Sequence, residues 1–185
     1  MCKQAGASIA HQAGGGKRGS AVCRRLSPPC KMTAEVILST APTEAPMYQR
    51  PTLSLSQVRN AMNVMLDQAQ QEPDRPLAIA IVDADAKLLS YARMDNCRAL
   101  PQRMAVSKAY TSAMSGSDSN AYAERLKNEG RNIADFGDPQ LVAVQGAVVV
   151  RDPATDLVLG AIGVSGLTAQ EDEDLARLGM QALGL

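Results

Sequence analysis

Histidine is almost absent from this chain of 185 residues, and the single one, His11, lies within the first fifty positions. Residues 51–185 therefore cannot build a catalytic triad around an imidazole. They also cannot hold a metal ion through histidine ligands. Two common kinds of catalytic centre are thus excluded from the part of the chain that has a folding pattern.

Cysteine is also scarce, with four in the chain and no two of them in a Cys-x-x-Cys pair. A structural zinc site needs closely spaced thiolate or imidazole ligands, so we expect no metal site. Cys2, Cys23 and Cys30 precede residue 51 and leave Cys97 alone in the body, which does not indicate a disulfide framework. This usage favours a reducing compartment, and we predict a cytoplasmic protein.

Aromatic residues are scarce in the body as well, and it has no excess of positive charge. The chain has one Phe, four Tyr and no Trp, and residues 51–185 hold 12 basic against 17 acidic residues. Nucleic-acid surfaces need clustered Lys and Arg, and single strands are held by stacking on aromatic rings. We therefore expect no nucleic-acid partner. We also expect no membrane span, because no apolar run approaches about 18 residues.

The first fifty residues differ from the rest in composition. They hold seven basic and two acidic residues, and positions 1–31 have no acidic residue at all. We expect residues 1–50 to form a disordered basic tail and residues 51–185 to form a single domain. Two explanations of the tail stay open: a targeting segment, or an extension upstream of a true start at Met32 or Met47.

The body alternates between helical and strand-like patterns. Apolar residues recur every three or four positions in some segments and run continuously in others, with turn residues between them. The expected helices are 54–71, 101–116, 118–129 and 168–183, and the expected strands are 77–82, 88–94, 141–150 and 157–164. The order predicts an α+β fold in which helices cover an antiparallel sheet.

Two local details refine this pattern. The first hairpin turn, 83–87, lacks glycine, so we expect an aspartate to take any left-handed position. The predicted second helix, which Pro101 opens, carries a strip of small residues that allows close packing against a sheet or a partner: Ala105, Ala109, Ala113 and Gly116.

A glycine-rich stretch, "LGAIGVSGLTAQEDEDLARLG", joins the last strand to the last helix. Its spacing matches neither a dinucleotide fingerprint nor a P-loop. Thr168 and Glu171 form a capping box, and four carboxylates at 171–174 would repel a phosphate at the helix start. Two interpretations remain: the glycines end a strand and allow tight packing, or they leave room for a ligand or a neighbouring subunit.

Together with "AIAIVDADAKLLSYARMD" and "KAYTSAM", this stretch resembles the GlcG/HbpS-like family, which includes the C-terminal domain of PduO-type proteins. The resemblance runs from about residue 53 to residue 183. It implies an α-β-α domain, assembly into homo-oligomers and, in some members, haem binding with links to haem degradation or iron sensing.

This chain departs from the family pattern at three places. Asp85–Ala86 stands where glycine is common in the first turn, and Asn96–Cys97 follows "RMD" in place of Gly-Ala. The segment Gln145–Gly146–Ala147 replaces a Gly-Gly-x-Pro stretch. These changes fall where a ligand pocket would be rimmed, so a family ligand need not carry over.

We predict a small-molecule pocket lined by the end of the "RMD" strand, the "KAYT" helix face and the "GVSG" turn. Its expected ligand-binding residues are Arg93, Met94, Asp95, Met104, Lys108, Thr111, Gly163, Val164, Ser165 and Gly166. Haem is the first candidate ligand, and its axial ligand has to come from one of these: Tyr110, Tyr122, Met94, Met104, Cys97, Lys108 or Thr111. Replacing Lys108 and Thr111 by alanine is expected to weaken ligand binding without unfolding the domain.

Two other classes of function stay open. The first is an enzyme for a small organic acid, in which Arg93 and Arg103 hold a carboxylate. Its acid–base groups would be drawn from Asp95, Glu171, Lys108 and Tyr110. Convergence of Arg93, Asp95 and Lys108 across one cavity would favour it. A plain ion pair also explains Arg93 and Asp95, and a helix cap explains Glu171. The second is an assembly module that packs the small residues between subunits.

Overall fold

The computed structural model describes residues 49–185, so the prediction of a disordered tail lies outside the described residues. Four α-helices occupy this part of the chain: α1 (Leu55–Ala69), α2 (Ala99–Ser115), α3 (Ser119–Asn128) and α4 (Ala169–Gln181). The strands are β1 (Ala78–Asp83), β2 (Leu88–Arg93), β3 (Ala147–Arg151) and β4 (Val158–Ser165), and a short 3₁₀ helix, η1, covers Ile133–Phe136. No helix within 49–185 is both long and apolar enough to cross a membrane.

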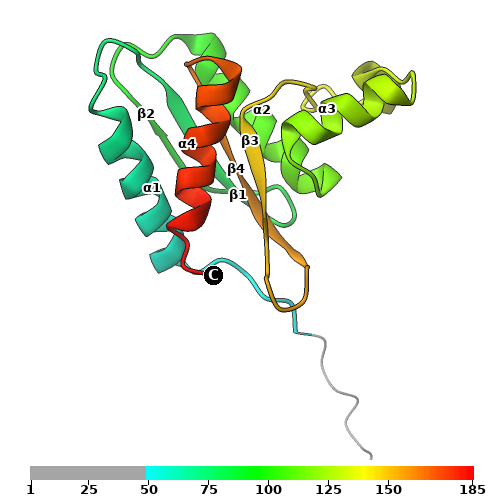
Figure 1. Ribbon diagram of the computed structural model, residues 1–185, viewed down its shortest axis with the longest axis horizontal. Helices are drawn as coiled ribbons and strands as arrows, with labels where there is room; N and C mark the ends of the chain where they lie inside the picture. The colour runs from blue at the N-terminus through cyan, green and yellow to red at the C-terminus, as the bar shows by residue number, and fades with distance from the viewer. Residues whose placement is uncertain (1–48) are drawn as a thin grey trace, which may run out of the picture. The chain divides into compact units, whose positions relative to one another are not determined.

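The four strands form one antiparallel sheet in the order β2-β1-β4-β3. Helices α1 and α4 lie side by side on one face, and α2 lies on the opposite face (Figure 1). Side chains of β1 alternate between these layers, with Ile79 and Ile81 packed in the α1–α4 core and Ala80 and Val82 facing α2. The predicted α+β class and the helix-flanked antiparallel sheet are both confirmed.

Helix α2 approaches the sheet closely because both surfaces are made of small residues. A Cβ atom added to Gly163 would lie 2.3 Å from the carbonyl oxygen of Ala105 and 2.6 Å from the backbone nitrogen of Ala109. The small-residue strip therefore packs against β4. Gly116 ends the helix in the left-handed conformation, as its position predicts.

Three local expectations differ from the structure. In the first turn, Ala86 and not an aspartate takes the left-handed conformation, with φ of +59°. The carboxylate of Asp83 accepts the N–H groups of Asp85 and Lys87, which holds Asp83 at the start of the turn. Helix α2 begins at Ala99, two residues before Pro101. Residues 141–146 form a strap that leads into β3 and are not part of the strand.

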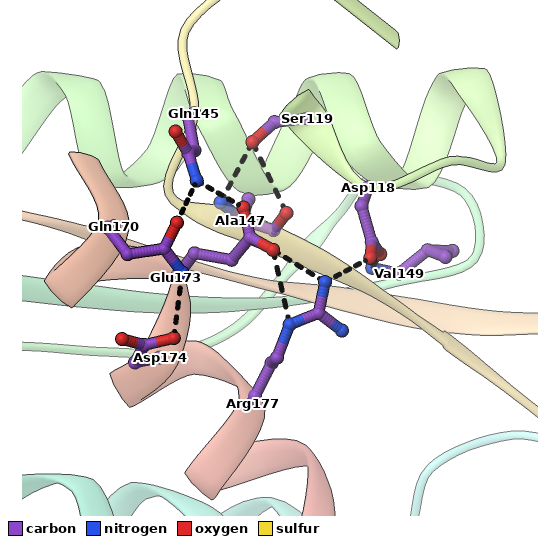
Figure 2. Close-up of polar contacts among 9 residues, drawn as sticks. All are labelled: Asp118, Ser119, Gln145, Ala147, Val149, Gln170, Glu173, Asp174 and Arg177. Atoms are coloured by element: carbon purple, nitrogen blue, oxygen red, sulfur yellow. Dashed lines mark hydrogen bonds and ion pairs between the residues drawn. The ribbon is translucent and has the colours of Figure 1, made fainter. Parts of the chain in front are cut away.

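The free edge of β3 is covered by the start of α3 (Figure 2). Ser119 Oγ accepts the N–H of Ala147 and donates to the carbonyl of the same residue. The carboxylate of Asp118 accepts the N–H of Val149 through Oδ1. Two side chains thus make three of the hydrogen bonds that a neighbouring strand would make at this edge.

Helix α4 begins with the predicted capping box, in which Thr168 Oγ1 accepts the N–H of Glu171 and the Glu171 carboxylate accepts the N–H of Thr168. The same carboxylate receives two hydrogen bonds from the guanidinium of Arg75, at 3.0 and 2.6 Å. These contacts stabilise its ionised form and lower the pKa of Glu171 to about 2.

We therefore expect Glu171 to contribute to acid stability. Since its pKa falls from 4.5 to about 2 on folding, the folded state binds fewer protons in that window. The free energy of unfolding then decreases as the pH falls through this range. Glu171→Gln should flatten that part of the curve in urea titrations at stepped pH, whereas Glu124→Gln, an exposed change on α3, should leave it unaltered. Equal acid sensitivity of the wild type and Glu171→Gln would contradict this assignment.

Candidate functional site

A cavity of about 360 Å³ opens where the start of α2, the strap before β3, the end of β4 and the start of α4 meet. This volume falls in the lower part of the range for small-molecule pockets. Its lining residues are Arg98, Leu100, Pro101, Met104, Lys108, Val144, Gln145, Ser165, Gly166, Leu167, Ala169 and Asp172.

The charged part of this cavity is an ion pair between two buried side chains. Lys108 Nζ lies 2.8 Å from Asp172 Oδ2, and the relative exposures of the two residues are only 3% and 2%. The ammonium also donates to the carbonyl of Val164 at 3.0 Å, and Asp172 Oδ1 accepts the N–H of Leu167. The pair thus links α2 and α4 to the end of β4.

Burial raises the pKa of Asp172 because the interior disfavours the ionised carboxyl, and the hydrogen bond from Lys108 offsets this only in part. Gly146 provides space for the pair. A Cβ atom at this position would lie 2.5 Å from Lys108 Nζ and 2.8 Å from the Cβ of Asp172. A larger residue in the strap would therefore push into the pair.

Asp172, the partner of Lys108, is not among the residues predicted from the sequence. All four acidic residues at 171–174 were explained by the helix start, whereas only Glu171 belongs to the capping box. The side chain of Asp172 points into the molecule and continues the buried face formed by Leu175, Ala176 and Gly179. That spacing of three, four and seven residues was the available signal.

The rim of the cavity is fixed by a polar network (Figure 2). Gln145 Nε2 donates to the side-chain oxygen of Gln170 at 3.1 Å and to Glu173 Oε2 at 2.9 Å. Glu173 in turn accepts from Arg177, whose Nη2 also donates to Asp118 at 2.8 Å. Because a carboxylate can only accept, these contacts set the orientation of the Gln145 amide.

The structure brings together part of the predicted site. Met104, Lys108, Ser165 and Gly166 line the cavity, and the carbonyl of Val164 is bonded to Lys108. The remaining five ligand-binding candidates lie outside this lining: Arg93, Met94, Asp95, Thr111 and Gly163.

The structure places these outlying candidates individually. Met94 packs against the α1–α4 core, while Arg93 and Asp95 are exposed at the end of β2. Thr111 is fully buried and joins α2 to the strap, since its Oγ1 donates to Ser107 O and accepts the N–H of Val142.

Tyr110, Arg103 and Glu171, the remaining groups of the enzyme hypothesis, also lie outside the cavity lining. The hydroxyl of Tyr110 donates to Asp138 Oδ2 at 2.8 Å, and this bond raises its pKa. Arg93 and Asp95 do not line the cavity that contains Lys108. Among residues 49–185, no group of three or more His, Cys, Asp or Glu side chains is arranged to hold a metal ion.

Comparison with known proteins gives a consistent picture. A family model described as "Haem degrading protein HbpS-like" matches residues 53–181. Protein GlcG of Escherichia coli K12 is 30% identical over 109 residues, which cover 59% of this chain and 78% of GlcG.

Solved structures share the fold at lower identity. A double mutant of Streptomyces reticuli HbpS has a TM-score of 0.66 at 24% identity and covers 80% of this chain and 100% of its own. A PduOC–haem complex has a TM-score of 0.64 at 20% identity and covers 71% of this chain and 95% of its own. Klebsiella pneumoniae ORFY has a TM-score of 0.65 at 17% identity and covers 76% of this chain and 97% of its own.

Proposed function

The chain belongs to the HbpS-like family, and from that premise we propose that its cavity binds a small apolar molecule carrying carboxylate groups. Haem or a related tetrapyrrole is the first candidate. We include in the proposal that the chain acts in the cytoplasm, as its cysteine usage favours, and as a homo-oligomer, as the family resemblance implies.

The observation that carries the proposal is the buried ammonium of Lys108. An ammonium has three donors, and within the described residues Asp172 and Val164 take two of them. The third donor is available to an acceptor inside the cavity. Arg98 adds a second cation to the lining, and because Asp172 is paired with Lys108, the guanidinium is the charge left for a ligand carboxylate.

The walls of the cavity suit an apolar body. Leu100, Pro101, Met104, Val144 and Leu167 supply the apolar part of the lining. Val144 is 42% exposed on the strap and contributes apolar surface at the rim. A molecule with an apolar ring and acidic substituents is therefore complementary to this site in both respects.

The cavity offers little to a haem iron. When bound, haem would supply an iron centre that takes an axial ligand, and Met104 is the one lining residue whose thioether suits that role. Lys108 is engaged as an ammonium by Asp172. The other predicted axial candidates lie outside the lining: Met94, Cys97, Tyr110, Thr111 and Tyr122. The residues present thus fit the periphery of a tetrapyrrole, with Met104 as the group that would contact the metal.

The proposal is tested by titrating the full chain with haem and with iron-free protoporphyrin, followed by absorbance. We expect saturable binding of both, and a loss of roughly tenfold in affinity for both in Arg98→Gln, because hydrogen bonds between charged groups are the strong ones. Met104→Leu should shift the haem spectrum and leave protoporphyrin affinity unchanged. Arg103→Gln, on α2 but outside the lining, is the matched control.

Two results would overturn the proposal. The first is uptake without saturation, as expected of any apolar surface. The second is an Arg98→Gln variant that binds both ligands as tightly as Arg103→Gln does. Either would remove the tetrapyrrole from this cavity.

A further inference from the structure

A second cavity, of about 290 Å³, lies on the other side of the sheet, between the end of α1 and the start of α4. Its apolar floor is formed by five side chains: Ala69, Leu77, Leu167, Leu175 and Leu178. Its polar rim consists of Gln68, Glu72, Arg75, Glu171 and Asp174. The lining therefore carries three carboxylates and one guanidinium.

Arg75 is not available to an anion in this cavity. Its Nη1 donates to Glu72 at 2.8 Å and to Glu171 at 3.0 Å, and its Nη2 donates to Glu171 at 2.6 Å. The positive charge is thus neutralised in place by two carboxylates. An anionic ligand would meet the surplus negative charge of the rim without a free donor to compensate.

Two carboxylates on the rim keep an acceptor for a ligand. The contacts of Glu72 use Oε2, with Arg75, and those of Asp174 use Oδ1, with Gln170. Within the described residues, Glu72 Oε1 and Asp174 Oδ2 are the oxygens outside these contacts. Each can accept a hydrogen bond from a cation placed above the apolar floor.

The helix ends at this cavity reinforce the preference for positive charge. The negative end of the α1 dipole reaches the cavity at Ala69, and the last turn of α1 contains no basic residue. The positive end of the α4 dipole is complemented by Glu171 in the capping box. The electrostatic field of the cavity therefore favours a cation.

From these observations we propose that the α1–α4 cavity is a second binding site, which takes an organic cation: an alkyl or aryl ammonium compound. The apolar part of the ligand lies on the leucines of the floor, and its ammonium group donates to Glu72 and Asp174. This site shares only Leu167 with the lining of the Lys108 cavity and does not depend on the function proposed for that cavity.

The test is a calorimetric titration of the full chain with three probes that share one apolar body: hexylammonium, 1-hexanol and hexanoate. We expect saturable binding of hexylammonium, roughly tenfold weaker binding of hexanol, and no binding of hexanoate. The alcohol lacks the charge-assisted hydrogen bond, and the carboxylate of hexanoate is repelled by the carboxylates of the rim. The variant Glu72→Gln/Asp174→Asn should bind hexylammonium no more tightly than the wild type binds hexanol.

The matched control is Asp67→Asn/Glu124→Gln, which removes the same charge at exposed positions outside the cavity lining. It should retain the affinity of the wild type. Equal affinity for the ammonium and the alcohol, unchanged binding in Glu72→Gln/Asp174→Asn, or an equal loss in the control would each overturn the proposal, as would the absence of saturable binding.

Discussion

Replacing Lys108 by methionine is expected to lower the free energy of unfolding by about 3–5 kcal/mol. The change removes the ammonium and leaves the carboxylate of Asp172, which is 2% exposed, without its charged partner in the interior. It also leaves the carbonyl of Val164 without the hydrogen bond that Lys108 donates. Chemical denaturation monitored by circular dichroism measures the loss.

The double variant Lys108→Met/Asp172→Asn separates the charge from the packing. The asparagine keeps an oxygen for the N–H of Leu167 but carries no buried charge, so the double variant should be more stable than Lys108→Met alone. Lys87→Met, an exposed change in the first turn, should have a small effect. A double variant as unstable as the single one would show that the ion pair is not what Lys108 contributes.

This expectation revises the binding test suggested by the sequence. Alanine at Lys108 and Thr111 was expected to weaken binding and leave the domain folded, yet both residues are buried and bonded. A loss of binding in that double variant would mix the loss of a ligand contact with the loss of stability. The exposed Arg98 is therefore the better position to change.

The second large effect is expected at Gly163, where alanine should lower the free energy of unfolding by about 3 kcal/mol or more. The added methyl group would meet backbone atoms of Ala105 and Ala109, at 2.3 and 2.6 Å, which no side-chain rotation can relieve. Helix α2 would have to move away from β4. Thermal and urea unfolding of Gly163→Ala provide the measurement.

Gly137→Ala is the control for this prediction. A methyl group there meets no atom within 4 Å, and its cost is limited to the left-handed conformation of that residue, with φ of +66°. That cost is about 1–2 kcal/mol. A larger loss in Gly137→Ala than in Gly163→Ala would contradict the view that contact between α2 and the sheet depends on the missing side chain.

The fold could be predicted because short sequence patterns indicate most of its helices and strands. The apolar face that ends in Ala69, the capping box at Thr168 and the turn residues of the first hairpin each indicate an element within a short window. The resemblance to the GlcG/HbpS-like family, which the family match confirms, adds the order of the layers.

The strap at residues 141–146 was misjudged for a physical reason. Its apolar residues match the pattern of a strand, but the N–H of Val142 is bonded to the hydroxyl of Thr111 and not to a neighbouring strand. Val144 is exposed at the cavity rim. An apolar run in one sequence does not tell which groups will accept its backbone hydrogen bonds.

The candidate site was predicted less well because it depends on partners that are distant in the sequence. Lys108 and Asp172 are 64 residues apart, and nothing near either residue specifies the other. The α1–α4 cavity likewise joins Arg75 to Glu171 across 96 residues. The local pattern indicates that Glu171 is a helix cap, but it does not indicate that the same carboxylate binds the guanidinium of Arg75.

The covered edge of β3 has a consequence for how these molecules meet one another. Asp118 stands at the position that would cap α3, but its side chain makes no cap bond and is used on β3 and Arg177. The helix forgoes about 1 kcal/mol of capping, and a foreign strand would meet both backbone groups of Ala147 and the N–H of Val149 already bonded to side chains. Strand addition at this edge is thereby opposed, whereas β2, at the other end of the sheet, has no strand beyond it among residues 49–185.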